Sequence, residues 1–303
     1  MTGIIKKGET MSNMFDMLEG LSSHEEPDSR EQVLQPPFSY PGSKARSLAK
    51  ILPLLPYTGI YVEPFGGSAA VLLARRPCKL EVFNDRFAGV CAFYRCIRDP
   101  GLLYKLCERL ELVVHSREEF IWCKRTWKNA DDLVERAARW YYMTMFSFGR
   151  LGRNFGRSTS SKAVLCSLQD RLPLFPKIHE RFKHVQVENQ DAIQLIRDFD
   201  NHETVFYLDP PYIDADQGVY EHQMDHESHR RLLETIFSLK GYCAVSGYSN
   251  PLYNNQPWDN VHTWDSYVSI QSMAYTESNG KGDLKGQENR ASAEECMWIK
   301  EAK

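Results

Sequence analysis

The sequence has 303 residues and a formal net charge of −3, with 42% hydrophobic and 25% charged residues. These proportions are typical of soluble globular proteins and exclude a wholly disordered or collagen-like chain. At about 150 residues per domain, the length predicts two domains. The sequence has no apolar run of about 18 residues and no apolar block near its start, so we expect no membrane segment, no signal peptide and a cytoplasmic protein.

Charge is distributed unevenly along the chain. Residues 1–94 carry 10 basic and 10 acidic side chains, residues 95–190 carry 18 and 11, and residues 191–303 carry 9 and 19, so the net charges are 0, +7 and −10. Between Trp140 and Gln169 no residue is acidic, and aromatic residues are interleaved with basic ones. This pattern is typical of a nucleic-acid-binding surface, which we expect in the middle segment.

The predicted elements follow a polar segment, residues 1–35, which is expected to be a flexible tail. In residues 36–100, a Pro/Gly loop precedes a helix that ends near Leu55. Two strand-and-helix units come next, since apolar runs are bounded by turn residues. Their strands are expected at 60–62 and 80–83 and their helices at 69–74 and 88–98. Two such units in succession indicate a doubly wound α/β sheet.

Residues 101–183 depart from this alternation. Their apolar residues recur at helical spacing as far as residue 149, and a Gly/Arg/Ser-rich stretch follows, so we expect an inserted, mainly helical domain. Alternation resumes in residues 184–303, where Asp225 is expected to cap a helix and residues 279–287 to form a mobile loop. The strands are expected at 185–187, 204–208, 242–246 and 296–299, with another helix at 192–199.

A glycine turn follows the first predicted strand. In Glu63-Pro64-Phe65-Gly66-Gly67-Ser68 the two glycines allow close approach of a ligand to the backbone, because they carry no Cβ. The pattern is not G-x-G-x-x-G, so it does not predict a nicotinamide cofactor. Asp85 follows Glu63 by 22 positions, close to the spacing of about 20 at which a carboxylate meets ribose hydroxyls in such folds.

The segment Asp209-Pro210-Pro211-Tyr212 follows an apolar strand directly. Two successive prolines stiffen the loop, which offers the Asp209 carboxylate and the Pro210 carbonyl as acceptors and Tyr212 as an aromatic face. This combination suits an exocyclic amine: two acceptors hold its hydrogens and a ring stacks on its base. A purely structural polyproline turn is the alternative.

Histidines and cysteines do not predict a metal site. His222, His226 and His229 fall at helical spacing, but the neighbouring Asp225 and Glu227 are typical of an ordinary polar helix start. The eight cysteines include no C-x-x-C pair. We therefore expect no metal and interpret the cysteines as reduced, buried thiols.

Four motifs in order resemble those of the Dam-type (D12 class) DNA adenine N6-methyltransferases of bacteria and phages. They are Tyr40-Pro41-Gly42-Ser43-Lys44, the Glu63 to Gly67 turn, Asn84-Asp85 and the Asp209 to Tyr212 loop. The resemblance covers residues 37 to about 300. It implies a Rossmann-like S-adenosylmethionine domain formed by residues 36–100 and 184–303, an inserted target-recognition domain at residues 101–183, a base-flipping reaction on DNA and a bacterial cytoplasmic location.

The resemblance also implies roles for individual residues. Asp209, Pro210, Pro211 and Tyr212 correspond to the catalytic loop, and Asp209 also borders the cofactor. The expected ligands of S-adenosyl-L-methionine are Tyr40, Lys44, Glu63, Pro64, Phe65, Gly66, Gly67, Asp85 and Asp191.

Residues 116–156 resemble the recognition helices and DNA-contacting hairpin of the family. The expected DNA-binding residues are Arg150, Arg153, Asn154, Arg157 and Lys162. Arginines at this spacing either read guanine edges or hold phosphates, and both interpretations stay open, as does the target sequence. We expect a monomer, with a dimer on DNA as the alternative.

These features predict methyl transfer to adenine N6, with Asp209 as an orienting acceptor rather than a strong general base. Methylation of cytosine N4 or of RNA adenine is an alternative, because the same loop serves any exocyclic amine; Asp at position 209 favours adenine. A DNA-binding module that keeps the fold without catalysis is a further alternative.

Overall fold

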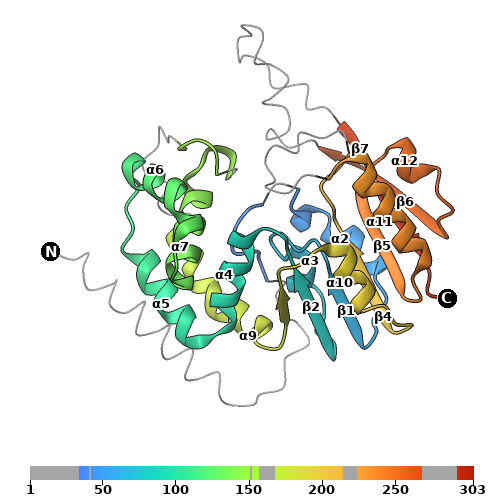
Figure 1. Cartoon of the computed structure of the whole chain (residues 1–303), viewed down its shortest axis with the longest axis horizontal. Helices are drawn as coiled ribbons and strands as arrows, with labels where there is room; N and C mark the ends of the chain where they lie inside the picture. Colours follow the sequence, from blue (N-terminus) through green and yellow to red (C-terminus); the bar gives the residue numbers. More distant parts are fainter. Residues whose placement is uncertain (1–33, 41, 151, 157–167, 214–223, 268–291) are drawn as a thin grey trace, which may run out of the picture.

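The computed structural model describes residues 34–40, 42–150, 152–156, 168–213, 224–267 and 292–303. Within these residues, seven strands form one sheet in the order β3-β2-β1-β4-β5-β7-β6 (Figure 1). The strands β3, β2, β1, β4 and β5 are parallel to one another, and β7 runs antiparallel to both of its neighbours. The strands are β1 (Ile60–Glu63), β2 (Leu80–Asn84), β3 (Gln186–Glu188), β4 (Thr204–Leu208), β5 (Tyr242–Tyr248), β6 (Asn260–Tyr267) and β7 (Ser292–Lys300).

Helices cover both faces of this sheet. The α-helices are α2 (Leu48–Ile51), α3 (Ala70–Ala74), α4 (Ala88–Arg98), α5 (Pro100–Glu111), α6 (Arg117–Thr126), α7 (Leu133–Phe146), α9 (Phe175–Phe182), α10 (Ala192–Asp198), α11 (His226–Ser238) and α12 (Pro251–Asn254). Short 3₁₀ helices lie at η1 (Lys44–Arg46), η2 (Leu52–Leu54), η3 (Trp127–Asn129), η4 (Phe148–Arg150) and η5 (Leu172–Leu174).

The alternation of side chains along the strands divides the core into two layers. Tyr61 and Val205 point to the layer formed with α2, α3, α4, α7 and α9. Their neighbours Val62 and Phe206 point to the layer formed with α10 and α11. Because successive residues of a strand face opposite sides, strands buried on both faces are continuously apolar. The expected doubly wound, Rossmann-like α/β fold is confirmed.

The helical segment between α4 and β3 packs against α4 through α5, α7 and α9. Figure 1 shows α5, α6 and α7 grouped beside the β3 end of the sheet, opposite β6 and β7. The ring centres of Phe38 and Trp140 of α7 lie 5.1 Å apart. Phe93 of α4 stacks on Tyr141 with a distance of 5.0 Å between ring centres. One continuous aromatic core therefore joins the first sheet unit to this segment. The domain boundaries at residues 100 and 184 stay a prediction.

Most expected elements are present, with small shifts at their ends. Strand β4 and helix α4 have the expected bounds, and Asp225 caps α11 by accepting from the Ser228 amide at 2.8 Å. Strand β6 was not expected, and β7 begins earlier, at Ser292. The expected tail (apart from Leu34 and Gln35) and the loop at 279–287 lie outside the described residues. In the part of the chain that the structure describes, no helix is long and apolar enough to cross a membrane.

Candidate functional site

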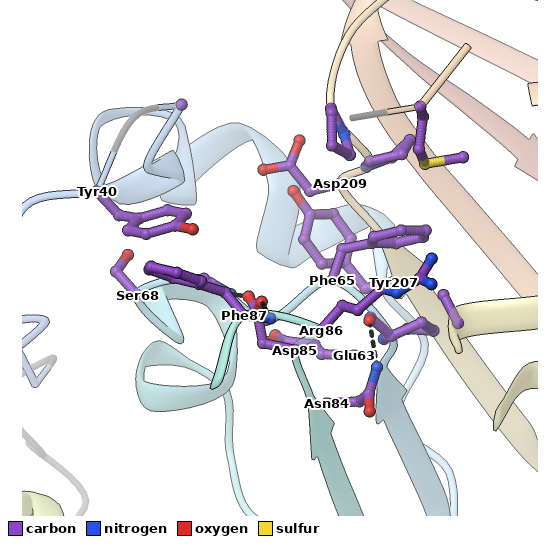
Figure 2. Close-up of a pocket in the computed structure, with 18 of the residues that line it drawn as sticks. Tyr40, Glu63, Phe65, Ser68, Asn84, Asp85, Arg86, Phe87, Tyr207 and Asp209 are labelled. Atoms are coloured by element: carbon purple, nitrogen blue, oxygen red, sulfur yellow. Dashed lines mark hydrogen bonds between the residues drawn. The ribbon is translucent and has the colours of Figure 1, made fainter. Parts of the chain in front are cut away.

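A pocket opens at the carboxyl ends of β1, β2 and β4, where ligands bind in open α/β sheets. Figure 2 shows side chains from these strands and from the loops that follow them converging on it. All of the residues expected at the cofactor and in the catalytic loop line this one pocket. They are Tyr40, Lys44, Glu63, Pro64, Phe65, Gly66, Gly67, Asp85, Asp191, Asp209, Pro210, Pro211 and Tyr212.

The turn after β1 requires its glycines. The Gly66 amide donates to the Asn84 carbonyl at 2.8 Å, and a Cβ at Gly66 would lie 2.1 Å from the ring of Phe83. Gly67 has φ +51°, and a Cβ there would lie 3.1 Å from the ring of Tyr40. The turn therefore lies flat against β2 on one side and against Tyr40 on the other, as only glycine permits.

Asn84 and Asp85, at the end of β2, tie three loops together. The Asn84 amide nitrogen donates to the Pro64 carbonyl at 2.8 Å, and its oxygen accepts from the Gln190 amide at 2.9 Å. The two carboxylate oxygens of Asp85 accept from the Gly67 and Phe87 amides, each at 2.8 Å. Burial raises the pKa of Asp85 to about 6, and these two hydrogen bonds oppose the shift. Asp85 thus shapes the glycine turn in addition to lining the pocket.

Asp191 occupies the N-terminus of α10. Its Oδ1 accepts from the Ile193 amide at 3.0 Å and the Gln194 amide at 3.3 Å, and Arg86 lies 3.7 Å from its Oδ2. This is an N-cap, which satisfies amides that the helix itself leaves without partners. Since the side chain is about half exposed, at 53%, Asp191 is accessible to a bound molecule at the rim.

Glu63 is a buried acid at the end of β1, 2% exposed. The Tyr61 hydroxyl donates to its Oε1 at 2.6 Å. Burial raises the pKa of Glu63 to about 8, although this hydrogen bond and the charge of Arg181 oppose the shift. A cation bound beside Glu63 would favour the ionised form. The carboxyl group is therefore suited to a positively charged ligand.

The loop after β4 places Asp209 against Lys44 of η1. The Lys44 Nζ lies 2.6 Å from both Asp209 oxygens and 2.9 Å from the Gly42 carbonyl. The Ser246 hydroxyl donates to Asp209 Oδ1 at 2.9 Å and meets the Tyr207 hydroxyl at 3.0 Å. Burial raises the pKa of Asp209, while the Lys44 ammonium lowers it. The carboxylate is thus held by charge-assisted hydrogen bonds at the mouth of the pocket.

Three residues of this network were not expected at the site: Tyr207, Ser246 and Glu295. Tyr207 precedes the loop on β4, Ser246 lies on the neighbouring β5, and Glu295 lies 3.7 Å from Lys44 on β7. Ser246 ends the apolar run 242–246, and Glu295 directly precedes the apolar run 296–299. A polar residue at the end of such a run is a signal that could have indicated these two residues.

The hairpin expected to contact DNA is a short antiparallel turn. Ser147 and Phe155 form an isolated bridge, and the Phe148 amide donates to the Asn154 carbonyl at 2.7 Å. Arg150 is half-buried, and burial together with nearby Arg171 lowers its pKa.

Further contacts hold the hairpin on the helical segment. The Lys124 ammonium of α6 donates to the Arg153 carbonyl at 2.6 Å. Asn154 is exposed, whereas Arg157 and Lys162 lie outside the described residues. The hairpin residues do not line the pocket described above.

The histidines of the predicted helix start do not meet in the described part of the chain. His229 is buried and its Nδ1 lies 2.9 Å from the Tyr253 hydroxyl, His226 is exposed, and His222 lies outside the described residues. Among the described residues, no group of three or more His, Cys, Asp or Glu side chains is placed to hold a metal ion.

Comparison with known proteins identifies the family. A search of curated proteins finds no match. The family profile described as D12 class N6 adenine-specific DNA methyltransferase matches residues 40–277, which include the glycine turn, Asp85 and the Asp209 to Tyr212 loop. The match spans well over half of the 303 residues. The chain therefore belongs to the D12 class of N6 adenine-specific DNA methyltransferases.

Proposed function

We propose that this protein transfers a methyl group from S-adenosyl-L-methionine to the N6 atom of an adenine turned out of DNA. The observation that carries the proposal is the meeting of the Asp209 to Tyr212 loop and the Glu63 to Gly67 turn in one pocket. The family supports DNA adenine methylation. The methyl donor, the flipped base and the roles of individual residues belong to the proposal.

The pocket suits S-adenosylmethionine in charge and shape. That molecule carries a sulfonium, an amino group, a ribose and an adenine. The pocket is lined by acidic side chains and aromatic rings. We assign Glu63 to the amino group, Asp85 to the ribose and Asp191 to the adenine. The missing Cβ of Gly67 leaves room for the ring of Tyr40, which lines the same pocket. Bound there, the cofactor supplies an electrophilic methyl group.

The chain's own residues would orient the base. The Asp209 carboxylate and the Pro210 carbonyl accept the two hydrogens of the adenine amino group, and Tyr212 stacks on the ring. Held in this way, the nitrogen lone pair leaves conjugation with the ring and points at the methyl group. The nitrogen becomes acidic once methylated, so its proton leaves readily and Asp209 acts mainly by orientation.

The basic segment supplies the affinity for DNA in this proposal. Arg150, Arg153 and Asn154 are carried by the hairpin, and Arg157 and Lys162 follow it in the sequence. Arginine and lysine neutralise phosphates and release counterions, which makes binding dependent on salt. We propose contact through these five residues and leave the target sequence to experiment.

The test is incubation with radiolabelled S-adenosylmethionine and DNA from a host without methyltransferases, followed by identification of the labelled nucleoside. We expect N6-methyladenine, at positions that map to a defined or relaxed target. An Asp209→Ala variant is the matched control. Label in N4-methylcytosine, preferential labelling of RNA, or no label from a protein that binds the cofactor would each overturn the proposal.

A further inference from the structure

Glu295 of β7 is a point of contact for several parts of the site, although it lies outside the matched range 40–277. The carboxylate is buried, 5% exposed. Its Oε2 accepts from the Trp264 indole at 3.1 Å and the Ser47 hydroxyl at 3.3 Å, and its Oε1 accepts from the Tyr212 hydroxyl at 3.5 Å. Glu295 thereby links the first loop, the loop after β4 and the far edge of the sheet.

The ammonium of Lys44 lies between two carboxylates. Its Nζ is 2.6 Å from both oxygens of Asp209 and 3.7 Å from Oε1 of Glu295, and it is 5.0 Å from the centre of the Tyr212 ring. Lys44 is 5% exposed, so its charge depends on these acids rather than on water. A buried ammonium without a nearby anion is strongly unfavourable.

The position of Lys44 limits how Asp209 can accept from a target amino group. A carboxylate has about four acceptor positions, two on each oxygen. Lys44 uses one on each oxygen, and Ser246 uses the other one on Oδ1. An adenine amino group that donates to Asp209 must therefore take the remaining position on Oδ2 beside Lys44, or shift the ammonium aside. Among the described residues, Glu295 is the other acid within 4 Å of the Lys44 ammonium.

We propose that Glu295 is a positioning residue that shares the Lys44 ammonium with Asp209 and receives it when the target amino group binds Asp209. The inference rests on the proposed function, because it concerns how the same site admits its substrate. In this proposal Glu295 touches no reacting atom and acts through Lys44 and Tyr212, while Ser47 and Trp264 hold its other oxygen. It keeps the lysine charge satisfied in both arrangements, so that Asp209 exchanges one donor for another.

The test uses the full chain, DNA with a mapped target adenine, and two variants. Glu295→Gln keeps the shape but removes the charge, and we expect a single-turnover rate about tenfold lower or more, with binding of S-adenosylhomocysteine unchanged. Glu295→Asp keeps the charge and is expected to retain more of the rate. Glu180→Gln is the matched control: Glu180 is a half-buried acid on α9 that pairs with Lys183 and does not line the pocket.

A second measurement does not require turnover. With S-adenosylhomocysteine bound, affinity is compared for DNA carrying adenine or purine at the target, since purine lacks the amino group. Glu295→Gln is expected to reduce the preference for adenine in the parent chain but to have no effect when Lys44→Met is also present, because the effects of residues that share a partner are not additive.

The outcomes separate the two proposals. Failure of the unaltered protein to methylate adenine rejects the proposed function and this inference with it. If the unaltered protein methylates adenine, two results overturn the inference alone. One is an equal loss of rate in Glu295→Gln and Glu295→Asp. The other is an undiminished preference for adenine in Glu295→Gln.

Discussion

The carboxylate of Asp85 holds the amide of Gly67 at 2.8 Å and thereby fixes the turn that lines the pocket. Its other oxygen holds the Phe87 amide, so one side chain anchors the loops after β1 and β2 together. Both amides belong to loops whose backbone would otherwise require water or ligand as partners. The geometry of the pocket thus depends on an acid for which the sequence pattern predicted only a role in ligand binding.

Replacement of this acid should affect both shape and binding. Asp85→Asn exchanges one acceptor for a donor, so one backbone amide loses its partner, and we expect the free energy of unfolding to fall by about 1–2 kcal/mol. Binding of S-adenosylhomocysteine, measured by calorimetry, should weaken as well. Asp132→Asn is the control. Asp132 caps α7 and does not line the pocket, and Asn caps helices equally well. Unchanged stability and binding in Asp85→Asn would contradict this role.

Glu63 should make the stability of the protein decrease with pH. Burial raises its pKa to about 8 in the folded chain, above the ordinary value of 4.5, so the folded state binds the proton more tightly than the unfolded state does. The stability that protonated Glu63 contributes is fully present below the pKa of the unfolded state. It is lost as pH rises toward the pKa of the folded state. Between about pH 5 and pH 8, Glu63→Gln should gain stability relative to the parent by up to about 1.4 kcal/mol per pH unit.

Chemical denaturation at several pH values, without ligand, measures this difference. Glu234→Gln is the matched control, since Glu234 is exposed on α11; its stability relative to the parent should not vary with pH. A constant difference between Glu63→Gln and the parent across that range would show that Glu63 is ionised in the folded protein.

Removal of the Asp209 carboxylate should separate transfer from cofactor binding. Asp209→Ala removes an acceptor for the amino group, and we expect the single-turnover rate to fall about a hundredfold or more. The fold should persist, because Glu295 still lies 3.7 Å from the Lys44 ammonium. Calorimetry with S-adenosylhomocysteine should find binding largely retained. Undiminished turnover would reject the proposed mechanism.

The arginines of the hairpin should set the salt dependence of DNA binding. Replacing Arg150 and Arg153 by Gln is expected to weaken binding and to reduce the slope of log affinity against log salt by about 0.9 for each phosphate that the variant no longer neutralises. Fluorescence anisotropy across a range of salt concentrations measures the slope. Arg76→Gln, an exposed arginine after α3, is the control. An unaltered slope in the hairpin variants would show that the hairpin does not bind DNA.

Local patterns predicted most of the sheet. The run Thr204–Leu208 contains no charged residue because β4 is buried on both faces, and it ends directly before the Asp209 to Tyr212 loop. Strand β6 escaped prediction for the opposite reason: it lies at the sheet edge, and its residues 260–263 are exposed, so its sequence is polar and shows no buried run. Its pairing with β7 depends on contacts distant in the sequence, which local periodicity does not encode.

The chemical groups of the site and their order along the chain can be predicted locally, because glycine turns, stiff proline loops and apolar strands depend on short segments. Which of these groups meet depends on the three-dimensional packing. Lys44 and Asp209 are 165 positions apart, yet their charged atoms lie 2.6 Å from each other. Glu295 joins them because β7 inserts beside β5. Such a juxtaposition follows from long-range strand pairing and burial, which no short segment specifies.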